Sequence, residues 1–424
     1  MAKPSGPTAR VRERALTRLA TRHPWIYKSD LERVEGASGG DVVTVRDSRA
    51  RFLARALYSD RSEIALRVVS WDEVAVDAGF WTRAFDDALA FRTQVAPGAE
   101  SLRLVHGEAD GFPGLVVDRF ADVVSIQTLT QGAERLKSFW VDLIQSRLHP
   151  RSIVERNDSR VRVLEGLSEI TGVLAGEDPG EVEVQQGPVR LAVQPLEGQK
   201  TGAFLDQREN REAAARWASG SVLDVFSAEG GFAVRLAAVS SVSSVEAIES
   251  SAASIERGRA NAARNGVTVQ WREANAFDAI RELVVARRRY DTVVLDPPAF
   301  ARTRRDLEGA LRGYKEINLR GLKLLGPGGI LVTCTCSHHV SESDFERIVA
   351  EAAADAGRDV TVLERRGAAA DHRVRLSIPE SAYLKCMILR VDRVSPPLVT
   401  SRSHEPRKPA AAARPARRHA PRPG

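Results

Sequence analysis

From residue 221 onward, short apolar segments alternate with longer segments whose apolar residues recur every three or four positions. The short segments have the length and β-branched content of buried strands, and the longer ones have the spacing of amphipathic helices. This alternation predicts an α/β fold with a mostly parallel sheet covered by helices on both faces. The expected strands are 221–226, 244–248, 268–272, 291–295, 330–335 and 359–363, with 383–390 as a hairpin partner of the last.

The pattern differs nearer the N-terminus. Alternating segments at 41–45 and 64–69, with a Gly-Gly turn before them, predict a small β module. Farther on, helical spacing at 80–95 and 133–148 is interleaved with strand-like segments, which predicts a small α/β unit. We therefore expect a β-rich module at 1–75, a small α/β middle domain at 76–190, a larger α/β domain at 191–392 and a disordered, basic Pro/Ala/Arg-rich tail at 393–424.

Composition narrows the class of protein. The chain has 424 residues, of which 43% are hydrophobic and 28% charged, as in ordinary globular domains. No apolar run approaches the roughly 18 residues that a membrane span needs, and the basic N-terminus lacks the apolar segment of a secretory signal. Three cysteines provide no disulfide framework, so a reducing, cytoplasmic compartment is expected.

The net charge of +6 is unevenly distributed. Residues 396–424 contain seven Lys/Arg and one Glu, and residues 1–22 contain six Lys/Arg and one Glu, which leaves about −5 on the body. Basic ends on an acidic body fit contact with a polyanion, because binding releases the counterions of the polyanion. Solvated ends that keep the protein soluble would have the same composition, so charge alone leaves both interpretations open.

The segment 222–232 reads as a buried strand, a glycine turn and the start of a helix. Glycines let a ligand approach the backbone, but the spacing is not that of a dinucleotide or phosphate-binding loop. Asp224 suits the cationic amino acid moiety of a cofactor such as S-adenosylmethionine, and Glu249 at the next strand end suits ribose hydroxyls. The alternative is a helix-capping loop and a surface acid. Asn275 either meets an adenine ring or caps the helix that begins at Ala276.

Asp296-Pro297-Pro298 follows a fully apolar strand. Two prolines stiffen the turn and remove N–H donors, so exposed carbonyls and one carboxylate can hold the edge of a planar base. Phe300 could stack on that base. Pro-Pro also ends strands without any such role, although ligands of open α/β sheets bind at the carboxyl ends of the strands.

The cysteines form the last candidate group. Cys334 and Cys336 lie two residues apart on an expected strand, so their side chains should share a face. Buried packing is the common state of free cysteines, and it is expected for Cys334 and for Cys386 in its apolar strand. Cys336 lies nearer the strand end and is the candidate nucleophile. No second Cys/His cluster accompanies His338 and His339, so no metal site is expected.

With these residues in view, the chain resembles the bacterial large-subunit ribosomal RNA cytosine carbon-5 methyltransferases from about residue 10 to residue 391. The resemblance implies a class I, Rossmann-like methyltransferase sheet preceded by a β-rich PUA module and a small α/β middle domain. It also implies S-adenosylmethionine as cofactor and ribosomal RNA as partner. The matching segments are 23–25, 107–108, 110–114, 118–119, 200–202, 204–208, 230–232, 295–298, 313–315, 336–337, 371–372 and 383–385.

The resemblance implies roles for single residues. Cofactor-binding positions would be Asp224, Phe226, Gly230, Gly231, Glu249, Asn275, Asp296 and Gln207. RNA- or base-contacting positions would be Arg208, Pro297, Pro298, Phe300, Lys315, His23 and Trp25. The conserved thiol of the family aligns with Cys336, which would be the catalytic nucleophile, and Asp296 would assist at the edge of the base.

The implied reaction is methylation of cytosine carbon 5 through a covalent bond between Cys336 and carbon 6. It needs a thiolate, so we expect a locally lowered pKa for Cys336, and it needs an unstacked base. Methylation of an exocyclic amine without a thiol is an alternative. A non-catalytic RNA-binding assembly factor is another, because Ala228-Glu229 stands where relatives often carry Tyr-Thr. Whether the chain forms a homodimer is left open.

Overall fold

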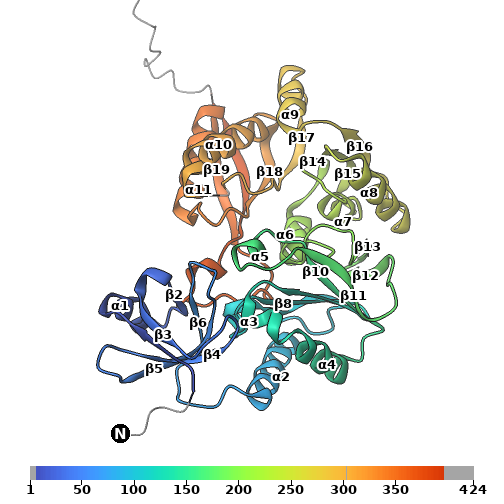
Figure 1. Ribbon diagram of the computed structural model, residues 1–424. Coiled ribbons are helices and arrows are strands. Elements are labelled where there is room, and N and C mark those ends of the chain that lie inside the picture. Colours follow the sequence, from blue (N-terminus) through green and yellow to red (C-terminus); the bar gives the residue numbers. More distant parts are fainter. Residues whose placement is uncertain (1–5, 302, 396–424) are drawn as a thin grey trace, which may run out of the picture.

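The computed structural model describes residues 6–301 and 303–395, so the tail expected at 393–424 lies outside the described residues from 396 onward. Four sheets follow one another along the chain. The N-terminal and middle sheets lie side by side in one half of the molecule, and the C-terminal sheet forms the other half (Figure 1). Within the described part, no helix is long and apolar enough to cross a membrane. The boundaries at 75, 190 and 392 stay predictions.

The N-terminal sheet has six strands in the order β2-β6-β5-β4-β1-β3. They are β1 (Thr8–Val11), β2 (Trp25–Ile26), β3 (Leu31–Glu35), β4 (Val42–Arg46), β5 (Phe52–Tyr58) and β6 (Leu66–Ser70). Strand β1 pairs with both β3 and β4, and α1 (Glu13–Ala20) buries Ala15 and Leu19. The interpretation of residues 1–22 as a solvated end is therefore wrong from Thr8 onward, because apolar residues between the arginines enter the core.

The middle sheet has the order β11-β10-β9-β8-β7 and packs on α2 and α4 through Trp81, Phe85 and Trp140. Its elements are α2 (Ala78–Val95), β7 (Ser101–His106), β8 (Leu115–Phe120), β9 (Val123–Thr128), α3 (Gln131–Arg135), α4 (Lys137–Leu148), β10 (Ser152–Asn157), α5 (Val161–Leu164) and β11 (Ile170–Gly176). The single helix predicted at 133–148 is two helices that meet at Leu136. The hairpin of β12 (Val182–Gln186) and β13 (Val189–Val193) forms a separate sheet.

The C-terminal sheet has seven strands in the order β16-β15-β14-β17-β18-β20-β19. The first five are parallel, and β19 and β20 form the expected antiparallel pair. The strands are β14 (Gly220–Val225), β15 (Val242–Glu249), β16 (Gln270–Glu273), β17 (Tyr290–Leu295), β18 (Leu325–Thr335), β19 (Arg358–Arg366) and β20 (Lys385–Val394). The chain order reverses between β14 and β17, which is where open α/β sheets form a binding crevice.

Helices cover both faces of this sheet, as the alternating pattern predicts (Figure 1). Residues of α6 and α7 pack on one face, and residues of α9, α10 and α11 pack on the other. The helices are α6 (Arg208–Trp217), α7 (Gly231–Ala237), α8 (Ala252–Arg264), α9 (Ala276–Val285), α10 (Leu307–Lys323) and α11 (Glu342–Ala356). With both faces buried, ligands can reach the sheet only at the ends of its strands.

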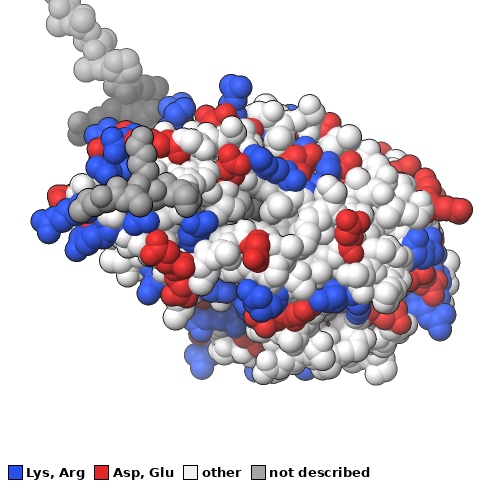
Figure 2. Space-filling model, turned by 60° about the horizontal axis from the view of Figure 1, so that its bottom comes forward, with Lys and Arg blue, Asp and Glu red and all other residues white. Residues whose placement is uncertain are grey.

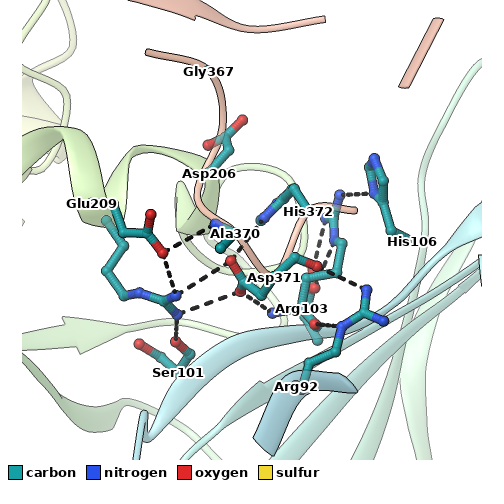
Figure 3. A network of polar contacts seen from close by, with 12 residues as sticks. Arg92, Ser101, Arg103, His106, Asp206, Glu209, Gly367, Ala370, Asp371 and His372 are labelled. Carbon is teal, nitrogen blue, oxygen red and sulfur yellow. Dashed lines mark hydrogen bonds and ion pairs between the residues drawn. The ribbon is translucent and has the colours of Figure 1, made fainter. Parts of the chain in front are cut away.

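A buried network of charges joins the middle domain to the chain between β19 and β20, which we call the connection (residues 367–384) (Figure 3). The Asp371 carboxylate accepts a hydrogen bond from the Arg103 backbone amide at 2.7 Å and lies 3.3 Å from the Arg208 guanidinium. The Arg92 guanidinium donates to the Asp371 carbonyl at 2.8 Å and pairs with Asp110 at 2.6 Å. These contacts fix the connection against β7 and α2.

Replacing Asp110 by Asn should destabilise the protein strongly. The side chains of Arg92 and Asp110 are 2% and 0% exposed, so the variant leaves a buried guanidinium without its main counter-charge. Such a change typically costs about 3–5 kcal/mol. The control is Asp122→Asn, because the Arg151–Asp122 pair is about half exposed and should be worth less than about 1 kcal/mol. Calorimetric unfolding profiles measure both, and equal small shifts would contradict the assignment.

Candidate active site

A cavity of about 580 Å³ opens at the carboxyl ends of β14, β15, β17 and β18. The hairpin β12–β13 and residues 199–207 form its other wall. Because parallel strands end at the same edge of a sheet, residues that are distant in the sequence meet here. The residues that line the cavity and were singled out from the sequence are Gln207, Phe226, Gly231, Glu249, Asn275, Asp296, Pro297, Pro298, Phe300 and Cys336.

The turn after β14 brings the backbone to the cavity. Phe226 and Ala228 have left-handed φ angles of +66° and +48°, and Gly230 has +82°. A Cβ atom on Gly230 would lie 2.8 Å from the ring of Trp271, so a side chain does not fit there. Non-glycine residues rarely adopt such angles without support from their surroundings, and they concentrate at functional sites. The turn therefore has the geometry of a ligand-binding loop.

Asp224 lies beneath this turn and is 1% exposed. Its Oδ2 accepts hydrogen bonds from Ser227 Oγ at 2.6 Å and from the Ala233 amide at 3.0 Å, whereas its Oδ1 has no partner within the described chain. Burial raises the pKa of Asp224 to about 6, and the two hydrogen bonds offset this effect only in part. Asp224 thus shapes the turn from below, and its unpaired oxygen favours a ligand that donates a hydrogen bond.

Glu249 and Asn275 lie farther along the same wall. One carboxylate oxygen of Glu249 accepts from the Ala228 amide at 2.9 Å, and the other accepts from the two backbone amides that follow it at 2.8 and 2.9 Å. Asn275 caps α9, because its side-chain oxygen accepts from the amides of Phe277 and Asp278. The capping interpretation of Asn275 is therefore right, and its place in the wall leaves an adenine contact open to the amide nitrogen.

Asp296 lies where β17 ends. Its Oδ1 accepts a hydrogen bond from Gln207 Nε2 at 2.9 Å. Burial and then the neighbouring Asp206 carboxylate raise the pKa of Asp296 to about 7, against the opposing charge of Lys200. At neutral pH the group therefore exchanges between its acid and its base form, which is the property that a general acid or base needs.

Phe300 forms part of an aromatic wall of the cavity, and its stacking on a base stays a prediction. Its ring lies 4.6 Å from that of Tyr314 between centroids, and Phe277 and Phe226 lie at 5.7 and 6.4 Å. Phe226, Phe277 and Phe300 of this cluster line the cavity.

The structure separates the cysteines. Strand β18 ends at Thr335, so Cys336 begins the loop beyond it and lines the cavity, whereas Cys334 and Cys386 are opposite each other in the sheet and buried. Burial and then the charge of Asp296 raise the pKa of the Cys336 thiol, and Lys200 opposes them. The expected lowered pKa is therefore wrong for this structure, because burial and a nearby carboxylate outweigh the ammonium group.

No role was predicted from the sequence for four polar residues near the thiol, which are Lys200, Asp206, Tyr383 and Lys385. Asp206 Oδ2 accepts from Lys200 Nζ at 2.6 Å and from the Tyr383 hydroxyl at 2.7 Å. Lys385 Nζ donates to the Tyr383 carbonyl at 3.1 Å and to the Ser337 carbonyl, next to the thiol, at 3.4 Å. All four residues lie in segments that are part of the family resemblance, 200–202, 204–208 and 383–385. The resemblance could therefore have pointed to them.

Some expected RNA contacts lie outside the cavity. Arg208 pairs with Asp371 at 3.3 Å as part of the buried network. Lys315 pairs with Asp355 at 2.9 Å and with Glu351 at 3.4 Å, both on α11. Neither Arg208 nor Lys315 lines the cavity, and both are paired with carboxylates, so an RNA contact from either stays a prediction.

His23 and Trp25 are engaged between domains. His23 Nε2 lies 3.2 Å from Glu380 of the connection, and Trp25 Nε1 donates to Glu108 of the middle domain at 3.1 Å. Both side chains thus attach the N-terminal module to the rest of the molecule, and a direct RNA contact from either stays a prediction.

Comparisons with known proteins agree with this arrangement. Residues 9–71 match the model of the PUA-like domain family, and residues 165–386 match that of the S-adenosylmethionine-dependent methyltransferases. A protein of Shewanella denitrificans named ribosomal RNA large subunit methyltransferase I is 38% identical over 390 residues, which cover 90% of this chain and 97% of that protein. One of the same name from Aeromonas hydrophila is 40% identical over 389 residues, with 89% and 97% covered. The chain belongs to the ribosomal RNA large subunit methyltransferase I family.

As a member of the ribosomal RNA large subunit methyltransferase I family, the chain is an S-adenosylmethionine-dependent methyltransferase. The expected fold, a PUA-like domain followed by a Rossmann-like methyltransferase domain, is confirmed. A solved structure of an S-adenosylmethionine-dependent methyltransferase from Streptococcus mutans shares the fold, with a TM-score of 0.78 and 19% identity over 91% of this chain and all of that chain. Another, with the same values, is described as a complex with S-adenosylhomocysteine.

The cavity fits this cofactor. Glu249 offers a carboxylate at the wall, the unpaired Oδ1 of Asp224 lies beneath the turn, and Phe226 and Phe277 provide apolar surface. Within residues 6–301 and 303–395, no group of three or more His, Cys, Asp or Glu side chains is placed to hold a metal ion.

Iodoacetamide should modify Cys336 before the other thiols, because Cys334 and Cys386 are 0% and 1% exposed. The raised pKa leaves little thiolate at pH 7, so the modification rate should rise with pH through the alkaline range. Lys200→Met should move this rise to higher pH, and Asp296→Asn should move it to lower pH. Timed mass spectrometry measures the rates. Identical pH curves in the three proteins would contradict the electrostatic assignment.

Proposed function

We propose that this enzyme methylates carbon 5 of a cytosine in large-subunit ribosomal RNA, with Cys336 as the nucleophile. The observation that carries the proposal is that Cys336 and Asp296-Pro297-Pro298 line the same cavity as the turn after β14. The names of the relatives support the RNA substrate, and the PUA-like domain supports RNA binding.

The thiol supplies the activation that the base lacks. Carbon 5 of cytosine is a weak nucleophile, and addition of the Cys336 thiolate to carbon 6 moves the electron pair of the ring double bond onto carbon 5. The bound cofactor supplies an electrophilic methyl group, which carbon 5 accepts. A base then removes the proton from carbon 5, the bond between Cys336 and carbon 6 breaks, and the thiolate is restored.

Asp296 is the residue that we assign to the protons. Its pKa of about 7 makes both forms available at neutral pH. The carboxylate form takes the proton of the Cys336 thiol. The acid so formed donates that proton to the ring edge as the thiolate adds, so no second negative charge stands beside the sulfur. The carboxylate formed in that step is then available to accept the carbon-5 proton, directly or through water. Gln207 holds Asp296 through the 2.9 Å hydrogen bond, so it acts as a positioning residue.

We assign the cofactor to the turn side of the cavity. Glu249 would accept from the ribose hydroxyls, and Asp224 would interact with the amino acid moiety through its unpaired Oδ1. Phe226 and Asn275 would border the adenine ring. The methyl group would then face Cys336 and Asp296 at the ends of β17 and β18.

Cys336→Ala should abolish 5-methylcytidine formation at the target, because no other described thiol lines the cavity. Cys334→Ala is the control: it removes a buried thiol two residues away and should retain the modification. Bisulfite sequencing of ribosomal RNA from strains that carry each variant measures the mark. Persistence of the mark in the Cys336→Ala strain would refute the covalent mechanism, and a methylated exocyclic amine in nucleoside mass spectrometry would favour amine methylation instead.

Glu249→Ala should weaken S-adenosylmethionine binding about 10- to 100-fold, because hydrogen bonds to a charged group contribute about 1.5–3 kcal/mol. Glu273→Ala removes an exposed carboxylate from the end of β16, outside the cavity, and should bind as the wild type does. Titration calorimetry measures both. Equal affinities would remove Glu249 from the cofactor site.

A further inference from the structure

Three hollows follow one another along the connection. The active-site cavity shares Leu384 with a second hollow of about 610 Å³, and this shares Pro379 with a third of about 1080 Å³. We call the third the junction groove, because its wall comes from all three parts of the molecule: Arg22 and His23 after α1, Phe91 on α2, and residues 373–379 of the connection. Hollows that share wall residues therefore adjoin one another from the active-site cavity to the N-terminal module.

The junction groove is basic. Arg22, Arg373 and Arg375 line it, and no Asp or Glu is among the described residues of its wall. Arg373 lies 3.3 Å from Asp110, but no described carboxylate pairs with Arg22 or Arg375. Elsewhere the charges are mixed: Figure 2 shows basic and acidic side chains interspersed over much of one face. An uncompensated positive charge in this groove suits a polyanion.

Apolar side chains project into the same groove. Leu376 is 100% exposed and Val374 is 52% exposed, and both line the groove. Val374 lies between Arg373 and Arg375, and Leu376 follows Arg375. The guanidinium of Arg373 lies 3.8 Å over the Phe91 ring. Guanidinium groups beside apolar and aromatic surface suit a strand that offers both phosphates and unstacked base faces. A duplex would offer its phosphates but keep its base faces stacked.

The second hollow lies closer to the thiol and is also lined by aromatic and cationic side chains. The rings of His338 and Tyr383 are stacked with centroids 5.3 Å apart, and Arg365, Arg366 and Lys385 lie on its wall. Glu342 and Glu380 are there as well, so its charge is less positive than that of the junction groove. Aromatic and cationic groups thus continue up to Leu384, where the active-site cavity begins.

We propose that the junction groove holds a single-stranded segment of the RNA beside the target cytosine, and that the second hollow leads this strand to Cys336. The inference rests on the proposed function for the identity of the nucleic acid. It explains how a base reaches the thiol without a duplex entering the cavity, because a base must leave its stack before it can react there. It also assigns RNA contacts to residues of the connection, in addition to the predicted contacts of Arg208 and Lys315 on other elements.

The test is equilibrium binding of the full-length protein to a fluorescent single-stranded RNA of about 20 nucleotides, compared with the same sequence as a duplex. Arg22→Gln and Leu376→Asp probe the groove. Arg287→Gln and Val285→Asp are the controls. Arg287 is exposed and has a φ of +54°, close to the +60° of Arg22. Val285 is 78% exposed. Both residues precede the amino end of β17, whereas the cavity lies at its carboxyl end. S-adenosylmethionine calorimetry verifies that each variant is folded.

We expect Arg22→Gln to weaken single-strand binding several-fold and to reduce the slope of log affinity against log salt by about 0.7, the value for one phosphate contact. Leu376→Asp should weaken it as well, and the controls should match the wild type. Wild-type binding by both groove variants would overturn the inference, even if Cys336→Ala abolishes methylation. Weakened binding together with a product other than 5-methylcytidine would support the groove as an RNA-binding site and refute the proposed chemistry.

Discussion

The buried Asp371 carboxylate is the interaction on which the arrangement of the domains depends. It meets the backbone of β7 and the side chain of Arg208, while its own carbonyl accepts from Arg92. One residue of the connection is thus held by both neighbouring domains. Unpaired charges at this depth would be costly, so the loss of one partner should destabilise the arrangement. The connection leads from Asp371 to Leu384, and its placement therefore sets one wall of the junction groove and brings Leu384 to the active-site cavity.

Asp296 and Cys336, two groups that can lose a proton, line the same cavity. The charge of Asp296 raises the pKa of Cys336, and burial raises the pKa of both groups. A site that held both as anions would be unstable, so the thiolate is favoured when Asp296 carries its proton. That coupling gives Asp296 a function beyond holding the ring edge. Lys200 is the cation that offsets both anions, but Asp206 binds it at 2.6 Å and reduces its effect.

Much of the fold could be predicted, because buried parallel strands leave a strong apolar pattern. The choice of Cys336 over Cys334 also followed from the sequence, since position along a strand decides which residue reaches the crevice. Charges were harder to interpret. The sequence shows the charges of Lys315 and Arg208 but not their carboxylate partners, which come from distant segments. Strand β1 was missed because arginines interrupt its apolar residues. The pKa of Cys336 depends on burial and on three neighbouring charges, which no local pattern records.

The raised pKa of Cys336 also affects when the thiol becomes reactive. Thiolates react with oxidants and electrophiles in solution, whereas protonated thiols are nearly inert. Burial beside Asp296 therefore protects Cys336 while no base is present. A cytosine in the cavity would change that balance, because the carboxylate form of Asp296 can take the thiol proton and pass it to the ring nitrogen while carbon 6 accepts the sulfur. On this argument the base itself completes the activation, and the raised pKa belongs to the mechanism as the resting state of the nucleophile.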